Sequence, residues 1–299
     1  MSKDIGFIGL GIMGKPMALN LMKKGFSLHV LDINENAVKE VVQYGARTAQ
    51  TPQKVAQNSD VIITMLPSDI HVKQVILGEN GVINGTKKGT IVVDMSSLNP
   101  QTSCDIASEL QKNDVYFLDA PVSGGEPKAI DGTLAIMVGG DETAFNKTKN
   151  IMQSMGQSVT YVGKSGSGCA TKLANQIIVN LNIAAMSEAF VLITKLGLDP
   201  TKVYEAIRGG LAGSTVLDAK VPMVINRNFE PGGRIDINLK DINNVLQVAT
   251  SNNLELPLTS QVLHIFNTLK EEGKLNKDHS AIIQYYEKLA NVQVGGKND

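Results

Sequence analysis

The stretch Gly6-Phe7-Ile8-Gly9-Leu10-Gly11-Ile12-Met13-Gly14 decides the fold predicted for this chain. Its glycines form the pattern G-x-G-x-x-G at the end of a short apolar run, Ile5–Gly9, that is typical of a β-strand. Gly9 allows a tight turn off the strand, Gly11 lets the backbone approach a pyrophosphate, and Gly14 permits close packing of the following helix. The N–H groups and positive dipole end of that helix favour a bound phosphate. The stretch therefore predicts a dinucleotide-binding turn.

An acidic residue follows this turn at the spacing that dinucleotide binding requires. Asp32 ends the next apolar run, Leu28–Asp32, 18 residues after Gly14. A carboxylate there can accept both ribose hydroxyls and would repel a 2′-phosphate, which favours NAD(H), with NADP(H) as the alternative cofactor. Ile33 beside it offers no positive charge to a 2′-phosphate. A turn without any cofactor, and a turn or capping role for Asp32, are the structural alternatives. The predicted cofactor contacts here are Gly9, Leu10, Gly11, Ile12, Met13, Gly14 and Asp32.

Short runs rich in Val and Ile alternate with helix-like stretches through the first half of the chain. Near-continuous apolarity is typical of parallel strands buried on both faces. Asn34 can cap a helix, and Thr51-Pro52 and Asn99-Pro100 each place a capping residue before proline at a helix start. Strands are predicted at Ile5–Gly9, Leu28–Asp32, Val61–Leu66, Ile91–Met95 and Val115–Val122. Such alternation predicts an α/β Rossmann fold, a doubly wound sheet with right-handed crossovers.

The second half of the chain has a different pattern. Leu134–Gly140 and Val159–Gly163 are predicted as the last strands, and β-rich runs stop after Gly166-Ser167-Gly168. One long helix is predicted from Cys169 to about Lys195. Further helices are predicted at Thr201–Ile207, Leu239–Thr250, Thr259–Lys270 and Ser280–Ala290. We therefore expect an NAD-binding Rossmann domain over residues 1–163, followed by an all-α C-terminal domain over residues 164–299 that serves the substrate and oligomerisation.

The composition is that of an ordinary globular protein, with 299 residues, 42% hydrophobic and 19% charged. The formal net charge of −1 gives no excess of basic residues, so nucleic acid is not expected as a partner. No stretch approaches the roughly 20 apolar residues of a membrane span, and no secretion signal is expected before the first strand. The two cysteines and four histidines show no metal-ligand spacing, so no metal is expected. A cytoplasmic protein fits these observations best.

Two segments follow the third and fourth predicted strands. They are Met65-Leu66-Pro67 and Ser96-Ser97. Ligands of open α/β sheets bind outside the carboxyl ends of the strands, so Leu66, Pro67 and Ser96 are expected to line the nicotinamide side of the cofactor. The alternative is that these are ordinary loop residues.

An anion site is predicted at the segment Asp119-Ala120-Pro121-Val122-Ser123-Gly124-Gly125. A strand ends in proline and is followed by a hydroxyl group and two residues without side chains. The hydroxyl of Ser123 and the backbone N–H groups of Gly124 and Gly125 could therefore hold a carboxylate or phosphate. A flexible turn without a ligand is the alternative.

The long predicted helix contributes a basic and an amide side chain. Lys172 and Asn175 are three residues apart, so they project from one face of the helix. A lysine in the first turns is poorly placed for the helix dipole, which indicates a role other than helix stability. Taken alone, however, Lys172 would more often be a solvated surface lysine.

Together these segments resemble the β-hydroxyacid dehydrogenase family, which includes 3-hydroxyisobutyrate dehydrogenase and 6-phosphogluconate dehydrogenase. The resemblance covers nearly the whole chain and rests on four motifs in the same order. They are Gly6–Gly14, Asp119–Gly125, Gly166–Asn175 (GSGCATKLAN) and Lys240-Asp241. Three further runs resemble one branch of the family in particular: GGEPKAIDGTLAIMVGGD (Gly124–Asp141), NIAAMSEA (Asn182–Ala189) and AIRGGLAGSTVLDAK (Ala206–Lys220).

The resemblance implies a role for each candidate residue. Lys172 would be the catalytic acid and base, and Asn175 would orient the substrate carbonyl or a neighbouring hydroxyl. The segment Ser123–Gly125 would bind the substrate carboxylate. Lys240 would approach the cofactor, and Asp241 would orient groups around it.

The activity implied by the resemblance is reversible, NADH-dependent reduction of tartronate semialdehyde (2-hydroxy-3-oxopropanoate) to D-glycerate. The expected partners are a small carboxylate-bearing aldehyde or hydroxyacid and further copies of the chain, in a homodimer or homotetramer. One alternative is 3-hydroxyisobutyrate dehydrogenase or another small β-hydroxyacid dehydrogenase. A second alternative, from another class, is a non-catalytic NAD-binding regulatory protein, which would be expected to lack the lysine.

Overall fold

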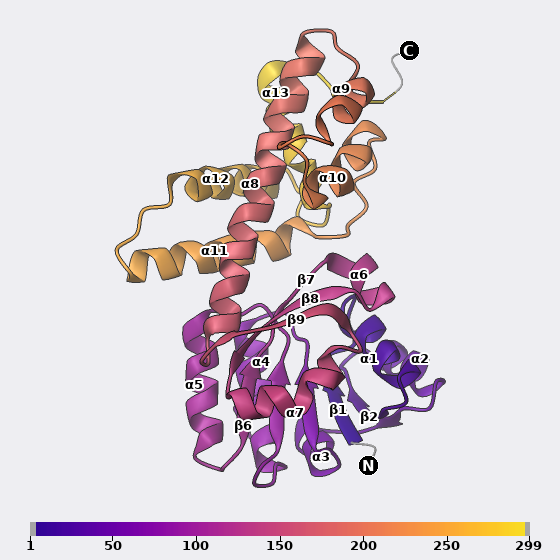
Figure 1. The fold of residues 1–299 in the computed structure, drawn as a ribbon, viewed down its shortest axis with the longest axis vertical. Helices are drawn as coiled ribbons and strands as arrows, with labels where there is room; N and C mark the ends of the chain where they lie inside the picture. The colour runs from indigo at the N-terminus through magenta and orange to yellow at the C-terminus, as the bar shows by residue number, and fades with distance from the viewer. Residues whose placement is uncertain (1–3, 297–299) are drawn as a thin grey trace. The chain divides into compact units, whose positions relative to one another are not determined.

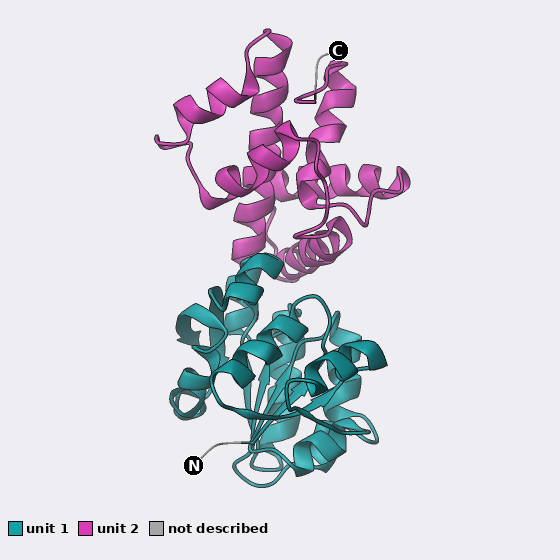
Figure 2. Ribbon diagram, turned by 90° about the vertical axis from the view of Figure 1, so that its right-hand side faces the viewer, with its two compact units in different colours: residues 1–172 teal, residues 173–299 magenta. Residues whose placement is uncertain are grey.

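The computed structural model describes residues 4–296. It divides into two compact units, Met1–Lys172 and Leu173–Asp299, coloured separately in Figure 2. The first unit is an α/β domain and the second is helical, which confirms the predicted fold class. The division falls inside a helix, whereas the domain boundary was predicted at the end of the last strand. Residues 1–3, on which the expected lack of a secretion signal partly rests, lie outside the described residues.

Parallel strands form the main part of the sheet (Figure 1). Their order is β3-β2-β1-β4-β5-β6. The chain winds outward from β1 in both directions, so the carboxyl ends of β1 and β4 form a topological switch point, where such sheets bind ligands. Beyond β6 the pattern changes: β8 pairs antiparallel with β6 and β7, and β9 pairs parallel with β8. The strands are β1 (Asp4–Ile8), β2 (Ser27–Leu31), β3 (Arg47–Thr48), β4 (Val61–Thr64), β5 (Ile91–Asp94), β6 (Tyr116–Asp119), β7 (Val122–Ser123), β8 (Leu134–Gly140) and β9 (Gly156–Gly163).

Helices cover both faces of the sheet, because successive strand residues face opposite sides. Phe7 packs in one cluster with Met17 of α1, while its neighbour Ile8 packs in the other with Ile76 of α4. The first face is covered by α1 (Gly14–Lys23), α2 (Glu35–Val42), α6 (Gly125–Asp131) and α7 (Glu142–Met152). The second is covered by α3 (Pro52–Gln57), α4 (Asp69–Leu77), the 3-10 turn η1 (Val82–Asn84) and α5 (Pro100–Gln111). The doubly wound architecture is therefore present.

The three predicted helix caps are confirmed. The side chain of Asn34 accepts hydrogen bonds at the start of α2, Thr51 at the start of α3, and Asn99 at the start of α5. Each side chain satisfies a backbone N–H that the first turn of a helix leaves without a partner.

The predicted strand Val115–Val122 is wrong as a single element. The strand β6 ends at Asp119, and the chain then turns into β7, which pairs with β8 instead of continuing beside β5. Pro121 lies at the break, where it has no N–H to donate to a ladder. The short elements β3 and α6 were not predicted, since two residues and seven residues carry little periodicity.

The second unit consists of helices packed around the C-terminal part of the long helix α8 (Ser167–Lys195), as Figure 1 shows. The others are α9 (Pro200–Ile207), α10 (Thr215–Ile225), α11 (Ile235–Ser251), α12 (Pro257–Glu271), the 3-10 turn η2 (His279–Ile282) and α13 (Ile283–Ala290). The predicted helices are present, except that the first residues of the predicted helix Ser280–Ala290 form the 3-10 turn η2 before α13 begins. The helix α11 begins four residues earlier than predicted. The helix α10 was missed because Pro222 lies in its interior, where proline usually ends a helix.

The helix α8 buries Ile183, Met186 and Phe190 in the core of the second unit, while Ala189 is exposed. By length and composition it is also the one helix within residues 4–296 that could cross a membrane, with a hydropathy of 1.8, contrary to the expectation that no stretch qualifies. Of its most apolar stretch, 39% is buried inside the protein. The core helix of a soluble protein passes the same test, so length and composition alone are weak evidence for a span.

Candidate active site

The glycine turn between β1 and α1 has the geometry that its sequence predicts. Gly9 has a φ of 99°, in the left-handed region that favours glycine, and a Cβ there would collide with the carbonyl oxygen of Met65. A Cβ on Gly14 would collide with the carbonyl oxygen of Gly9 and lie 3.3 Å from the Phe7 ring. The first and third glycines of the motif are therefore required by the packing of the protein itself.

Gly11 differs from the other two glycines of the motif. A Cβ at Gly11 would meet no described atom within 4 Å, its φ is outside the left-handed region, and the residue is exposed. Neither backbone conformation nor internal packing explains a glycine at this position. A requirement imposed from outside the chain, such as the close approach of a pyrophosphate, does explain it. The N-terminus of α1 next to it has neither a side-chain cap nor an acidic residue in its first turn, so its N–H groups can face an anion.

Asp32 connects the glycine turn to the end of β2. Its Oδ2 accepts a hydrogen bond from the backbone N–H of Leu10 at 2.5 Å, and its Oδ1 accepts one from the N–H of Asn34 at 2.6 Å. The turn role considered as an alternative is therefore present. A role toward a ribose remains a prediction that these contacts permit, because each carboxylate oxygen has more than one lone pair.

A buried aspartate that was not predicted from the sequence joins the segments after β4 and β5. Asp94 is fully buried at the end of β5, and its Oδ1 accepts from the hydroxyls of Thr64 at 2.7 Å and Ser96 at 2.6 Å. The same Ser96 hydroxyl accepts from the backbone N–H of Leu66 at 2.9 Å. Asp94 therefore fixes the positions of two predicted cofactor contacts, Leu66 and Ser96, relative to each other.

The surroundings of Asp94 disfavour the charged form of its carboxyl group. Its Oδ2 is buried and has no hydrogen-bond partner among the described residues. Burial raises the pKa of Asp94 to about 6, with a smaller contribution from the charge of Asp119, while the bonds from Ser96 and Thr64 oppose the rise. Asp119 is its register partner on β6, so two buried carboxyl groups lie side by side at the carboxyl ends of neighbouring strands.

Asp119 holds the first turn of α8. Its Oδ1 accepts from the backbone N–H of Gly166 and its Oδ2 from that of Cys169, both at 2.8 Å. A Cβ on Gly168 would collide with the carbonyl oxygen of Asp119, so the helix start packs directly on β6. Burial raises the pKa of Asp119 too, against the effect of these N–H groups. Asp119 thus links the strand before the Ser123 segment to the helix that carries Lys172.

The segment predicted to bind a carboxylate runs from the end of β7 to the start of α6. Ser123 pairs with Ala135 as the last residue of β7, and Gly125 begins α6. Gly124 has a φ of 140° and Gly125 a φ of 69°, so both need the conformational freedom of glycine. Gly124 and Gly125 therefore have no side chains of their own over their backbone N–H groups, next to the hydroxyl group of Ser123.

Lys172 is buried, with 8% of its surface exposed, which differs from an ordinary surface lysine. It lies in the second turn of α8, and Asn175 follows three residues later on the same continuous helix. The structure therefore supports the prediction that the two side chains project from neighbouring positions on one helical face.

The predicted residues of the second unit are joined by a buried glutamine that sequence reasoning missed. Gln176 accepts a hydrogen bond from Asn175 Nδ2 at 3.0 Å and donates one through Nε2 to Asp241 Oδ2 at 2.6 Å. Lys240 Nζ lies 3.2 Å from Asp241 Oδ1. Asn175, Lys240 and Asp241 thus form one network, and Asp241 is buried with its carboxylate facing these neighbours. This fits the predicted orienting role of Asp241.

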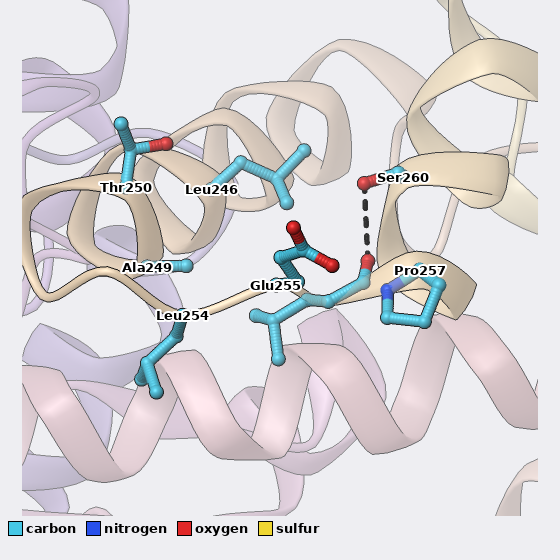
Figure 3. A pocket seen from close by; sticks show the side chains of 8 residues that line it. Leu246, Ala249, Thr250, Leu254, Glu255, Pro257 and Ser260 are labelled. Atoms are coloured by element: carbon cyan, nitrogen blue, oxygen red, sulfur yellow. Dashed lines mark hydrogen bonds between the residues drawn. The ribbon is translucent and has the colours of Figure 1, made fainter.

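Neither the hollow between α11 and α12 nor any group of metal-ligating side chains within residues 4–296 identifies another centre. A hollow of about 310 Å³ between α11 and α12 is shown in Figure 3, and its lining includes Leu246, Glu255 and Pro257. None of the predicted site residues lines it. Within residues 4–296 no group of three or more His, Cys, Asp or Glu side chains could hold a metal ion. Burial raises the pKa of both thiols, Cys104 and Cys169, which disfavours the reactive thiolate.

Comparison with known proteins accounts for both units. Residues 4–163 match the family described as the NAD binding domain of 6-phosphogluconate dehydrogenase. Residues 166–286 match the family described as NAD-binding of NADP-dependent 3-hydroxyisobutyrate dehydrogenase. The 2-hydroxy-3-oxopropionate reductase of Escherichia coli strain K12 is 44% identical over 96% of this chain and 98% of its own length. The chain belongs to the β-hydroxyacid dehydrogenase family.

Two further dehydrogenases match over similar lengths. The 2-(hydroxymethyl)glutarate dehydrogenase of Eubacterium barkeri is 38% identical over 99% of this chain and 98% of that protein. A solved structure of Mycobacterium tuberculosis 3-hydroxyisobutyrate dehydrogenase with L-serine superposes with a TM-score of 0.88 at 27% identity, covering 96% of this chain and 99% of that one. The chain is therefore an NAD(P)-dependent oxidoreductase of the β-hydroxyacid dehydrogenase family, as the resemblance implied.

Proposed function

We propose that the chain reduces tartronate semialdehyde to D-glycerate, reversibly, with NADH as the preferred cofactor. The observation that carries the proposal is a buried lysine, Lys172, which shares one helical face with Asn175 in a chain 44% identical to a 2-hydroxy-3-oxopropionate reductase. Burial of a lysine costs free energy unless its charge is paired, and ionisable groups held in such unfavourable surroundings are common at functional sites.

The glycine turn fits a dinucleotide. Gly11 leaves open space where a pyrophosphate would approach, and the start of α1 offers N–H groups next to it. Asp32 would accept the ribose hydroxyls, while Leu66 and Ser96, fixed by Asp94, would line the nicotinamide side together with Pro67. When bound, the cofactor supplies the hydride, and the carboxylate of Asp32 disfavours the 2′-phosphate of NADPH.

The chain's own residues would then bind the substrate and move a proton. Ser123 and the backbone of Gly124 and Gly125 would hold the substrate carboxylate, which fixes the aldehyde carbon in place. The Lys172 ammonium would stabilise the negative charge that develops on the aldehyde oxygen and donate a proton to it. In the reverse direction the neutral amine would take the proton from the hydroxyl group.

The deciding experiment compares initial rates for tartronate semialdehyde with NADH and with NADPH, measured side by side. We expect turnover with both and a higher kcat/KM with NADH. A higher kcat/KM with NADPH would refute the cofactor preference. Tight NADH binding without turnover of any small semialdehyde or hydroxyacid would favour the non-catalytic alternative.

A second candidate is 3-hydroxyisobutyrate dehydrogenase activity. It is favoured by the mouse mitochondrial enzyme of that name, which is 35% identical over 94% of this chain and 86% of that protein. Its substrate carries an apolar methyl group. Methylmalonate semialdehyde in the same assay separates the two candidates, since efficient reduction of it and none of tartronate semialdehyde would reverse the choice.

Association of copies of the chain is also proposed. The helix α8 leaves large apolar side chains exposed at Ile178 (62%), Leu192 (59%) and Leu196 (67%). Apolar surface of this kind favours burial against another copy. Light scattering coupled to gel filtration should give the mass of a dimer or tetramer, and a monomer at micromolar concentration would refute this part of the proposal.

A further inference from the structure

A polar side chain lies in the buried face of α1, which is otherwise apolar. Asn20 is 8% exposed, and its neighbours on that face include the fully buried Met17 and Leu21. A buried amide costs free energy unless its N–H groups find acceptors. Asn20 Nδ2 finds two, because it donates to the carbonyl oxygen of Ala129 at 2.7 Å and to that of Ile130 at 3.2 Å. Both acceptors belong to α6, 109 and 110 residues later in the chain.

The two acceptors lie in the last turn of α6, where a helix leaves its carbonyl oxygens without intrahelical partners. The left-handed cap at Gly132 satisfies the carbonyl oxygen of Lys128 through the Gly132 N–H group. Asn20 satisfies the carbonyl oxygens of the next two residues. The capping of α6 is therefore completed by a side chain from another helix, α1, which lies next to it in Figure 1.

The other end of α6 leads into the segment predicted to bind a carboxylate. The helix begins at Gly125, and Gly124 before it provides no side-chain cap. Ser123 precedes both glycines and is held by the pairing of β7 with β8. A helix of seven residues is too short to be stable alone. The segment Ser123–Gly125 therefore depends on two supports, the β7–β8 pairing on one side and the attachment of α6 to α1 on the other.

We propose that Asn20 is a positioning residue that fixes the segment Ser123–Gly125 relative to the glycine turn. The helix α1 begins at Gly14, directly after that turn. Asn20 thus connects the helix of the predicted cofactor site to the helix that starts in the predicted substrate site. Hydride transfer needs a fixed separation between its two reactants, and small displacements lower the rate. The consequence for the substrate rests on the proposed function, whereas the attachment of α6 to α1 does not.

Hydrogen exchange measured by mass spectrometry tests the attachment without substrate. The variant Asn20→Leu removes both N–H donors and keeps a side chain of the same branched shape. The backbone amides of residues 129–133 should exchange at least about tenfold faster in the variant than in wild type, whereas the amides of α7 in the same sample should not change. Unchanged exchange at residues 129–133 would overturn the proposal. Equal acceleration in both segments would overturn it too, because it would indicate general destabilisation.

The variant Thr148→Val is the matched control. Thr148 is fully buried on the same face of the sheet, and its hydroxyl group also contacts two carbonyl oxygens, at 2.8 Å and 3.4 Å. Those acceptors belong to its own helix, α7, so the variant loses bonds of the same kind without detaching α6. Exchange at residues 129–133 should match wild type. An acceleration there equal to that in Asn20→Leu would refute a specific role of Asn20.

Kinetic measurements separate positioning from a purely structural role. With saturating NADH, Asn20→Leu should raise the KM for tartronate semialdehyde at least about tenfold. The NADH dissociation constant from fluorescence titration should stay within about twofold, because the glycine turn is unchanged, and Thr148→Val should alter neither value. A wild-type KM in a variant whose α6 exchanges faster would overturn the positioning role. If wild type reduces neither semialdehyde, the proposed function fails, and the exchange experiment alone decides whether Asn20 attaches α6.

The isosteric variant Asn20→Asp tests the hydrogen bonds themselves. An ionised carboxylate has no donor and turns negative charge toward two carbonyl oxygens, so burial and these dipoles raise the pKa of the new carboxyl group. Below that pKa the neutral acid donates one hydrogen bond again. The kcat/KM of Asn20→Asp relative to wild type should therefore recover as the pH falls, whereas the relative loss in Asn20→Leu should not depend on pH. Parallel pH profiles of the two variants would contradict the proposed role of the amide.

Discussion

Replacing Asp94 by asparagine should change how the stability of the chain depends on pH. In the unfolded chain an aspartate has its ordinary pKa of 3.8, whereas burial raises the pKa of the native Asp94 to about 6. The native state therefore binds more protons between these two values, and stability falls as pH rises through this window. A difference of about two pKa units corresponds to ~3 kcal/mol of unfolding free energy. The wild-type protein loses this stability as the pH rises, whereas the variant, whose asparagine carries no charge, does not.

The variant also has a constant cost, which does not affect the argument. An asparagine in place of Asp94 would keep the acceptor for Thr64 and Ser96 but would bury an NH2 group where Oδ2 has no described partner. Such a buried donor costs about 1–3 kcal/mol at every pH. The quantity to measure is the difference in unfolding free energy between the two proteins, and how it changes from pH 4 to pH 7. The constant cost cancels in this comparison.

Urea unfolding of both proteins at pH 4, 5, 6 and 7 gives this quantity by linear extrapolation. Between pH 4 and pH 7 we expect the unfolding free energy of Asp94→Asn to rise by up to ~3 kcal/mol relative to that of wild type. Most of this change should be complete at pH 6. Asp119→Asn is a comparison for the constant cost at a single pH, since both oxygens of Asp119 accept from backbone N–H groups at 2.8 Å and an NH2 group there would oppose one of them. It should be destabilised at pH 7 by about 1–3 kcal/mol. Parallel stability profiles of wild type and Asp94→Asn would refute the reasoning.

Three further predictions concern the cofactor and the proton. Lys172→Ala should lower kcat by at least about 100-fold, because the developing charge loses its acid, while the NADH dissociation constant from fluorescence titration stays within about twofold; near wild-type turnover would disprove the mechanism. Asp32→Ala should weaken NADH binding about tenfold and raise the ratio of NADPH to NADH kcat/KM, since the carboxylate that repels the 2′-phosphate is gone; an unchanged ratio would contradict the cofactor assignment. Gly11→Ala should leave the unfolding free energy within about 1 kcal/mol of the wild-type value, yet it should weaken NADH binding at least about tenfold. Unaltered NADH binding would show that no ligand approaches the backbone at this position.

The parts of the fold that local sequence determines were predictable. Gly9 and Gly14 mark the turn after β1 because their conformational and packing requirements arise within a few residues of the chain. The helix caps Asn34 and Thr51 are local in the same way, since each bonds an N–H two or three residues ahead. The strand break after Asp119 was missed because it depends on β8, which pairs with β7 only after the chain has turned back.

The positioning groups of the candidate site could not be predicted in this way. Asp119 acts on Gly166, 47 residues later, and Gln176 acts on Asp241, 65 residues later, so no local pattern records either contact. Asp94 gave the clearest signal, as a carboxyl group at the end of the apolar run Ile91–Asp94. The candidates Lys172 and Asn175 were predicted from their helical spacing and from a family motif, whereas the hydrogen bond from Asn175 to Gln176 was found only in the structure.

The open space beside Gly11 means that the three glycines of one motif are needed for two different reasons. Gly9 and Gly14 are needed for the fold, whereas Gly11 is needed only where a ligand binds. A library of substitutions scored only for the amount of folded protein should tolerate Gly11 variants and reject Gly9 and Gly14 variants, whose added atoms would collide with the backbone. The same library scored for turnover should reject all three. Positions where the two scores disagree would mark residues that selection retains for a bound molecule and not for the fold, which locates ligand contacts without a ligand-bound structure.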